Sequence, residues 1–295
     1  MPFAPASPAD FAKVVAGAEE LRGLGFEVAD ATPLSAEGYF AGSSAGRRNE
    51  FLGALEREDV DALVAIRGGY GSNYLLEKLE VRRPDAAKVI LGYSDLTSLQ
   101  AYLWKRHAWV GFYAPMLAAG LEGGAGAPKG YDRESLLAAV GKTDGGWVLK
   151  LQSEALFGGE AEGRVLGGCM TLVETTLGTP WEFDTRGSIL LLEDRGMKPW
   201  QVDRTLMHLK QAGKFEGVQG IVLGEFPECD APGKGSATVR DVCVRILGAL
   251  HVPIAFGAAV GHTPRPMLTV PLGVKARLRA SGEGELQVLE PAVAP

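Results

Sequence analysis

The stretch Lys88–Trp104, KVILGYSDLTSLQAYLW, decides the fold that the rest of the chain completes. Its first part, Val89-Ile90-Leu91, is apolar and predicts a buried strand, whereas the apolar residues after Asp95 recur at a helical period. Strand and helix meet at Gly-Tyr-Ser-Asp, so Ser94 occupies the turn between them. A serine in such a turn is exposed, and the amide of Asp95 lies at the helix start, where free N–H groups can hold an oxyanion.

This corner permits two interpretations. Gly92 suits the sharp turn of a nucleophile elbow, but Leu96 stands where the G-x-S-x-G signature has its second glycine. The alternative is an ordinary strand-to-helix turn, in which Ser94 or Asp95 only caps the helix. The motif alone leaves both interpretations open.

Composition excludes several classes of protein. The 295 residues are 46% hydrophobic, which is enough for two domains with their own cores. A net charge of -6 and the lack of basic runs interleaved with aromatic residues argue against nucleic-acid binding. The N-terminus has no signal-peptide pattern, and no stretch reaches the length of a membrane span. We therefore expect a cytoplasmic protein that does not associate with membranes.

The cysteines and histidines predict no metal site. Three scattered cysteines without C-x-x-C spacing indicate reduced thiols, although one of them acting as a nucleophile remains an alternative. There is no H-E-x-x-H motif, and the four histidines fall in different predicted elements. We expect no metal and no organic cofactor, so hydrolysis by this protein should survive exhaustive chelation.

The pattern along the chain predicts an α/β fold. Helices and strands alternate in the first half, which is typical of a parallel sheet, and the last part alternates as short antiparallel strands do. The expected helices are 7–23 with Ser7 as its N-cap, 47–56, 199–212 and 238–250, together with the one after Gly168. The expected strands are 26–29, 62–66, 89–91, 188–192, 220–223 and 254–256, followed by the antiparallel segment 273–289.

Two glycine-rich segments, 118–130 and 141–146, interrupt this pattern. They indicate a connection between domains. We therefore predict an N-terminal domain at 1–118, a glycine-rich connection at 119–160 and a C-terminal domain at 161–295.

A glycine-rich loop, Arg67-Gly68-Gly69-Tyr70-Gly71, follows the predicted strand 62–66. The carboxyl ends of parallel strands share one edge of a sheet, so this loop and Ser94 are expected to face each other there. Glycine lets backbone amides approach a ligand closely. A phosphate-binding loop is the rival interpretation, but the Lys-Ser/Thr ending and the G-x-G-x-x-G spacing are missing. Plain turn chemistry is the other alternative.

A serine hydroxyl attacks an amide only with a base in hydrogen-bond reach, and the base needs an acid to orient it. His262 alone lies in a glycine-flanked loop after a strand, where a functional imidazole is expected, although it could also only stabilise that loop. Glu193 ends the apolar strand 188–192, whereas Asp194 would point the opposite way and cap the turn. His107, His208 and His251 are interpreted as a helix end, a packing residue and a strand entry.

At these residues the sequence resembles the LD-carboxypeptidase family, which also includes the microcin C self-immunity peptidases. The resemblance covers almost the whole chain and rests on several motifs in the same order. They are the loop Arg67–Gly71, the corner Gly92–Asp95, Gly167-Gly168, Leu192-Glu193-Asp194 with Pro199 and Asp203-Arg204, and Gly261-His262-Thr263 ahead of Pro271-Leu272-Gly273.

The resemblance implies a fold and a set of roles. It implies an N-terminal flavodoxin-like parallel sheet, a C-terminal α/β half with a small β-barrel-like sheet, and a homodimer. Ser94 would be the nucleophile, His262 the general base and Glu193 its partner, with the amides of Gly69 and Asp95 as the oxyanion hole. The same motifs place Tyr70 and Gly168 among the substrate-binding candidates.

Arg67 precedes the glycine loop and is our candidate for binding a terminal carboxylate, unless it only braces the loop through backbone carbonyls. Two departures from the family concern Met1–Pro5, where the usual first strand is almost missing, and Cys169-Met170, which replaces a common Asn-Leu. The second departure affects the substrate more than the chemistry.

The expected function is hydrolysis of an L,D-peptide bond, which releases the terminal D-alanine of murein tetrapeptide in peptidoglycan recycling. The alternative within the family is a microcin-type peptidase that cleaves a peptidyl-nucleotide or aminoacyl-nucleotide amide. The alternative from another class is a two-lobed protein that binds a small ligand, in which Ser94 would only contact that ligand.

Overall fold

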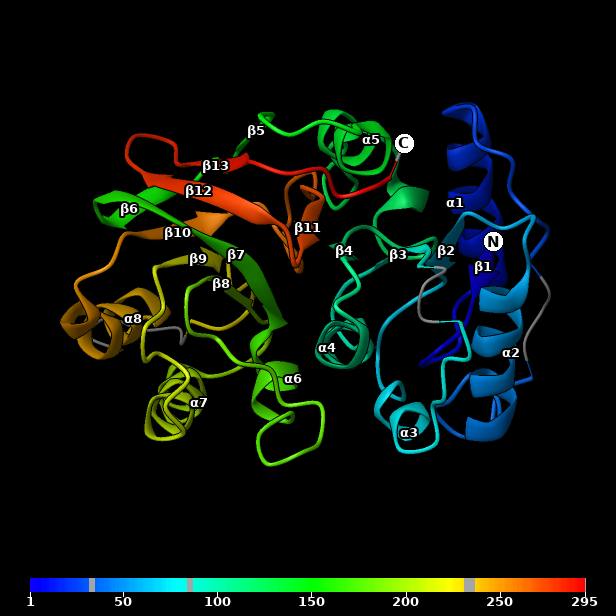
Figure 1. Cartoon of the computed structure of the whole chain (residues 1–295), viewed down its shortest axis with the longest axis horizontal. Coiled ribbons are helices and arrows are strands. Elements are labelled where there is room, and N and C mark those ends of the chain that lie inside the picture. The colour runs from blue at the N-terminus through cyan, green and yellow to red at the C-terminus, as the bar shows by residue number, and fades with distance from the viewer. Residues whose placement is uncertain (32–34, 84–86, 231–236, 295) are drawn as a thin grey trace.

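The computed structural model describes residues 1–31, 35–83, 87–230 and 237–294. Two β-sheets lie next to each other with helices packed around them (Figure 1). The chain is thus a mixed α/β protein, as the sequence predicts. Among the described residues no helix combines the length and the apolar character that a membrane span needs.

The first sheet has the strand order β1-β2-β3-β4-β11. Its first four strands are parallel, and β11 runs antiparallel to β4, so the C-terminal half completes the N-terminal sheet. The strands are β1 Pro2–Phe3, β2 Ala62–Ala65, β3 Val89–Gly92, β4 Gly111–Tyr113 and β11 Val270–Leu272. The helices of this half are α1 Phe11–Gly23, α2 Ser44–Glu56, α3 Asn73–Leu76 and α4 Leu96–His107.

The second sheet has the order β5-β13-β12-β7-β8-β9-β10-β6. Strands β7 to β10 are parallel and the outer strands are antiparallel. Its strands are β5 Val148–Lys150, β6 Glu154–Phe157, β7 Gly159–Cys169, β8 Ser188–Glu193, β9 Gly220–Gly224, β10 Ile254–Ala258, β12 Lys275–Ala280 and β13 Glu285–Val288.

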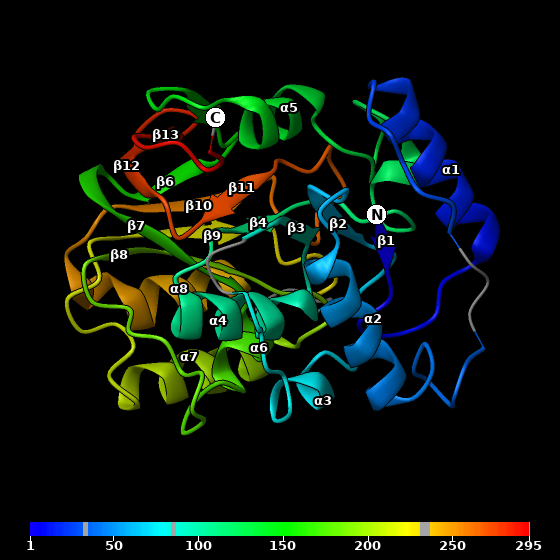
Figure 2. The ribbon, with the colours of Figure 1, turned by 45° about the vertical axis from the view of Figure 1, so that its right-hand side comes forward.

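This second sheet curls, and its β6 edge comes close to β12 (Figure 2). No pairing between described residues joins the edge strands β5 and β6, so the expected barrel-like sheet is an open one. The remaining helical elements are η1 Leu121–Gly123, α5 Arg133–Gly141, α6 Met170–Glu174, α7 Pro199–Gln211, α8 Val239–Leu247 and η2 Gly248–Leu250.

Several local predictions were wrong. Asp10, not Ser7, caps α1, because its side chain accepts the amide of Ala12. Residues 26–29 form no strand and pair with no other described strand, and the helix after Gly168 is the five-residue α6. The nearly missing first strand exists as β1, which pairs Pro2 and Phe3 with the edge of β2.

The predicted connection 119–160 holds η1, α5 and both edge strands of the second sheet. The division into domains stays a prediction. One apolar cluster passes from Phe112 in β4 and Val270 in β11 to Val222 in β9. A shared core of this kind holds the two sheets, and whatever lies between them, in fixed relative positions.

Helix α1 sits against the segment around Leu117 so closely that only glycine fits. A Cβ at Gly17 would lie 2.1 Å from the Leu117 carbonyl oxygen, whereas a Cβ at Gly23 would meet nothing within 4 Å. We expect Gly17→Ala to lower the free energy of unfolding by about 1–3 kcal/mol through overpacking. Gly23→Ala, in the same helix, should leave it unchanged or raise it by less than about 1 kcal/mol. Denaturant unfolding measures both, and equal effects would contradict this packing.

Candidate active site

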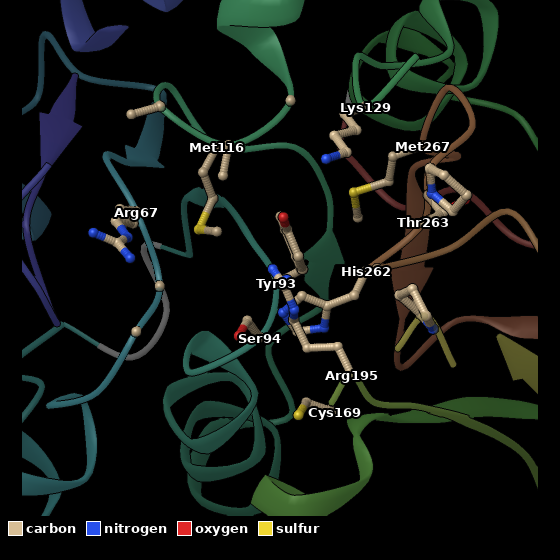
Figure 3. A pocket seen from close by; sticks show the side chains of 18 of the residues that line it. Arg67, Tyr93, Ser94, Met116, Lys129, Cys169, Arg195, His262, Thr263 and Met267 are labelled. Carbon is tan, nitrogen blue, oxygen red and sulfur yellow. The ribbon is translucent and has the colours of Figure 1, made fainter. Parts of the chain in front are cut away.

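A cavity of about 820 Å³ lies between the two halves and is lined by residues of both (Figure 3). Arg67, Gly69 and Ser94 come from the carboxyl edge of the first sheet, and Cys169 and His262 from that of the second. The volume suits a ligand of a few hundred daltons. The structure thus brings the predicted serine and histidine into one pocket.

Ser94 has the strained backbone of a nucleophile elbow. Its φ angle is 62°, in the left-handed region that non-glycine residues avoid. A Cβ on Gly92 would lie 2.7 Å from the Leu96 side chain, so glycine is needed where β3 turns toward α4. Leu96, which replaces the second glycine of the signature, begins α4 fully buried. Close packing, rather than a second glycine, therefore holds this turn.

Glu193 and His262 form a hydrogen-bonded pair beside this serine. The Nδ1 atom of His262 lies 2.9 Å from Glu193 Oε2, and the His262 backbone amide donates to the same oxygen at 2.8 Å. The Glu193 side chain is 0% exposed and that of His262 12% exposed. Because Nδ1 faces a carboxylate, it carries the hydrogen, and Nε2 is left as the proton acceptor.

Ser94 Oγ makes no hydrogen bond to His262 among the described contacts, although both line the pocket. Such bonds commonly shorten only in the substrate complex. The lack of this hydrogen bond in the free protein is therefore compatible with Ser94 as a nucleophile and His262 as its base.

Tyr113, which the sequence patterns did not single out, is fully buried at the end of β4. Its hydroxyl donates to Glu193 Oε1 and accepts the Ser94 amide at 3.3 Å. The available signal was its position, since a polar atom at the carboxyl end of a strand next to β3 is brought to the same edge as Ser94.

The glycine loop is fastened against the elbow. A Cβ on Gly68 would lie 3.1 Å from Ser94 Cβ, and Gly69 has a φ of 98° with Ser7 directly against it. Ser72 donates its amide to the Asp95 carboxylate at 2.8 Å. Among the described contacts the amides of Gly69 and Asp95 have no acceptor. Both are therefore free for an oxyanion.

Several cations line the cavity. Arg67 donates to the Pro8 carbonyl at 3.2 Å, which is the bracing contact considered from the sequence, but its guanidinium stays exposed. Lys129, which the sequence analysis missed, points into the cavity from the opposite side (Figure 3). Arg195 pairs with Glu228 at 2.9 Å.

Two predicted substrate-binding residues lie elsewhere. Tyr70 is not among the residues that line the cavity; its exposed ring joins those of Tyr39, Phe40 and Tyr74. Gly168 is buried, and a Cβ there would lie 2.5 Å from Thr97 Oγ1. It allows β7 to approach α4. A role of either residue in substrate binding stays a prediction.

Asp194 and the three remaining histidines have structural positions of their own. Asp194 accepts the amide and the hydroxyl of Thr171 at the start of α6, at 2.9 and 2.6 Å, so it caps, as expected. His208 is an exposed partner of Glu174. His107 ends α4, and His251 leads into β10.

The thiols are poorly suited to nucleophilic attack. Burial raises the pKa of Cys169 well above its usual value, that of Cys229 to about 11 and that of Cys243 to about 12. All three are therefore protonated near neutral pH, and only Cys169 borders the cavity. Within the described ranges no three His, Cys, Asp or Glu side chains are grouped as a metal site requires.

We expect the hydroxyl, and not a thiol, to be the reactive group. A fluorophosphonate should label Ser94, and iodoacetamide near neutral pH should leave the three buried thiols of the native protein unmodified. The control is unfolding in guanidinium, after which all three should react. Mass mapping of the labelled peptides decides, and rapid alkylation of native Cys169 would reopen the thiol alternative.

Both halves of the chain match models of known protein domains. Residues 2–114 match the model of the LD-carboxypeptidase N-terminal domain, and residues 162–278 match that of the LD-carboxypeptidase C-terminal domain. A probable murein peptide carboxypeptidase of Bacillus subtilis is 30% identical over 95% of this chain and 88% of its own. The microcin C7 self-immunity protein of Escherichia coli is 28% identical over 88% of this chain and 83% of its own.

A solved structure has the same fold. The muramoyltetrapeptide carboxypeptidase from Oxalobacter formigenes superposes with a TM-score of 0.86 at 26% identity, over 98% of this chain and 99% of that one. The likeness therefore extends over both sheets.

Proposed function

Because the chain belongs to the LD-carboxypeptidase family, we propose that it is a serine carboxypeptidase that releases the terminal D-alanine of murein tetrapeptide in peptidoglycan recycling. The observation that carries the mechanism is the buried Glu193–His262 pair in one cavity with Ser94. A buried carboxylate behind an imidazole, facing a serine on a strained turn, is the arrangement that acyl transfer requires.

The reaction would proceed through an acyl-enzyme. Ser94 attacks the carbonyl of the L,D-bond while Nε2 of His262 takes the hydroxyl proton, and Glu193 stabilises the imidazolium. The amides of Gly69 and Asp95 donate to the oxyanion. His262 then protonates the leaving D-alanine nitrogen, and a water activated by the same imidazole hydrolyses the ester.

The microcin-type activity is the second candidate, favoured by the self-immunity relative. Cys169, which stands where family members commonly have an asparagine, borders the cavity and bears on the substrate of either candidate. A thiol in place of an amide removes a strong hydrogen-bonding group from the substrate surface. The two-lobed binding protein finds no support, because family membership relates the chain to hydrolases.

Removing the charge behind the base tests the triad. Glu193→Gln keeps the shape and can still accept from Tyr113, but it no longer stabilises protonated His262. Turnover should fall by roughly two to four orders of magnitude with little change in unfolding. Asp194→Asn is the matched control beside it, and its effect should be small. Normal turnover of Glu193→Gln with an inactive Asp194→Asn would transfer the role to Asp194.

Among the described cations that line the cavity, Lys13 and Arg195 each pair with a glutamate, whereas Arg67 and Lys129 form no ion pair. We propose that Arg67 binds the terminal carboxylate. The measurement is the ratio of kcat/KM for a peptide acid to that for the matching C-terminal amide. Arg67→Gln should lower this ratio by roughly 10- to 100-fold, because a hydrogen-bonded ionic contact is lost. Lys129→Gln should change it little. The reverse pattern would assign the carboxylate to Lys129.

Chirality at the last residue tests which bond is cut. Inverting that residue while its carboxylate stays bound moves the scissile nitrogen away from Ser94, and a small misplacement costs about 100-fold. We expect initial rates on a peptide ending in D-alanine to exceed those on its L-alanine counterpart by at least about that factor, and Ser94→Ala to abolish them. Equal rates would reject the assignment, and activity only on aminoacyl sulfamoyl adenylates would favour the microcin-type alternative.

A cytoplasmic location and a homodimer belong to the same proposal. Both rest on expectations from the sequence and from the family.

A further inference from the structure

We propose that Tyr113 is a positioning residue, whose hydroxyl holds the Glu193 carboxylate and the Ser94 backbone in one geometry. This inference rests on the proposed roles of Ser94 and Glu193. It adds a link across the two sheets, since Tyr113 ends β4 of the first sheet and Glu193 ends β8 of the second.

The Glu193 carboxylate has few donors, and each is fixed. Oε2 receives the backbone amide and Nδ1 of His262, while Oε1 receives the Tyr113 hydroxyl. A Cβ on Gly224 would lie 2.5 Å from Glu193 Cβ, and one on Gly261 would lie 2.3 Å from Glu193 Cδ. Backbone thus closes the other sides, and Tyr113 is the donor supplied from the opposite sheet.

The same hydroxyl supports the nucleophile. The Ser94 amide donates to the Tyr113 oxygen at 3.3 Å, on the residue whose φ is strained at 62°. A phenol can accept one hydrogen bond while it donates another, so one atom joins the serine turn to the acid. Phenylalanine would leave the Ser94 amide without this acceptor and Glu193 Oε1 without this donor.

Tyr113 stays a neutral donor, because burial and the nearby Glu193 raise its pKa well above the usual value. Arg195 lines the same cavity and pairs with Glu228 at 2.9 Å. The other titratable groups beside the pair are Tyr93, whose ring packs edge-on against His262 at 5.1 Å, Cys169 and Asp194. Burial raises the pKa of all three. Tyr93 and Cys169 therefore stay uncharged near neutral pH, and Asp194 faces Thr171 instead.

The direction of the pH effect follows from the charge on the pair. The Tyr113 hydrogen bond stabilises Glu193 most when His262 is neutral, because an imidazolium would already compensate the carboxylate. Losing the bond therefore favours the protonated pair. The neutral imidazole that activates Ser94 then forms only at higher pH, so the acidic limb of the rate profile moves upward.

The test uses the inactivation of Ser94 by a fluorophosphonate as a function of pH. This reaction needs the activated serine but no peptide, so a wrong substrate assignment would not disturb it. Tyr113→Phe should slow inactivation by about 10- to 100-fold and move the acidic limb to higher pH. Tyr102→Phe is the control, since it also loses a buried hydroxyl, one that donates to the Leu79 carbonyl. It should leave rate and profile unchanged.

A second variant separates positioning from packing. In the Glu193→Gln background the negative charge is gone, although the amide oxygen can still accept from Tyr113 and the Ser94 contact remains. Adding Tyr113→Phe should therefore slow inactivation by less than about 10-fold. This double variant leaves no buried charge without its donor and keeps the test available if Tyr113→Phe alone unfolds. An unchanged rate in Tyr113→Phe, a loss without a shift of the limb, or a full further loss in the double variant would each overturn the proposal.

Discussion

The buried carboxylate of Glu193 is the constraint around which the two halves of this protein are arranged. A fully buried charge is costly unless its hydrogen-bonding capacity is met. Here the donors come from separate parts of the chain, namely Tyr113 at the end of β4 and the backbone and ring of His262 after β10. The carboxylate is therefore satisfied only when both sheets are in place, and the same condition brings His262 into the cavity with Ser94.

The surrounding backbone is shaped to permit this burial. Gly224 and Gly261 leave no room for a Cβ beside Glu193, and Gly168 lets β7 approach α4 and Tyr113. Strand β11 comes from the C-terminal half yet pairs with β4, which carries Tyr113. A continuous apolar cluster through both sheets holds these contacts in register. Rigid support of this kind lets a strained turn such as that at Ser94 persist, because the neighbouring structure determines it.

Much of this could be predicted from local sequence signals. A strand followed by a helix at Ser94, a glycine loop after another strand and an acid at the end of the apolar strand 188–193 each leave a pattern within a few residues. Pairings between segments that are distant in the sequence leave no such local pattern. The roles of β11 and Tyr113 depend on neighbours more than a hundred and about eighty residues away, respectively. Residues 26–29 show that a local pattern alone is not sufficient. The pattern there predicts a strand, but the segment pairs with no other described strand and forms none.

We propose that Ser94 carries the acyl group of the substrate during turnover. The most direct measurement is rapid acid quenching of the protein during its reaction with murein tetrapeptide, followed by mass mapping. We expect an added mass equal to the tripeptide acyl group on the peptide that contains Ser94, and neither adduct nor D-alanine release in Ser94→Ala. Release of D-alanine at an undiminished rate by Ser94→Ala would contradict it.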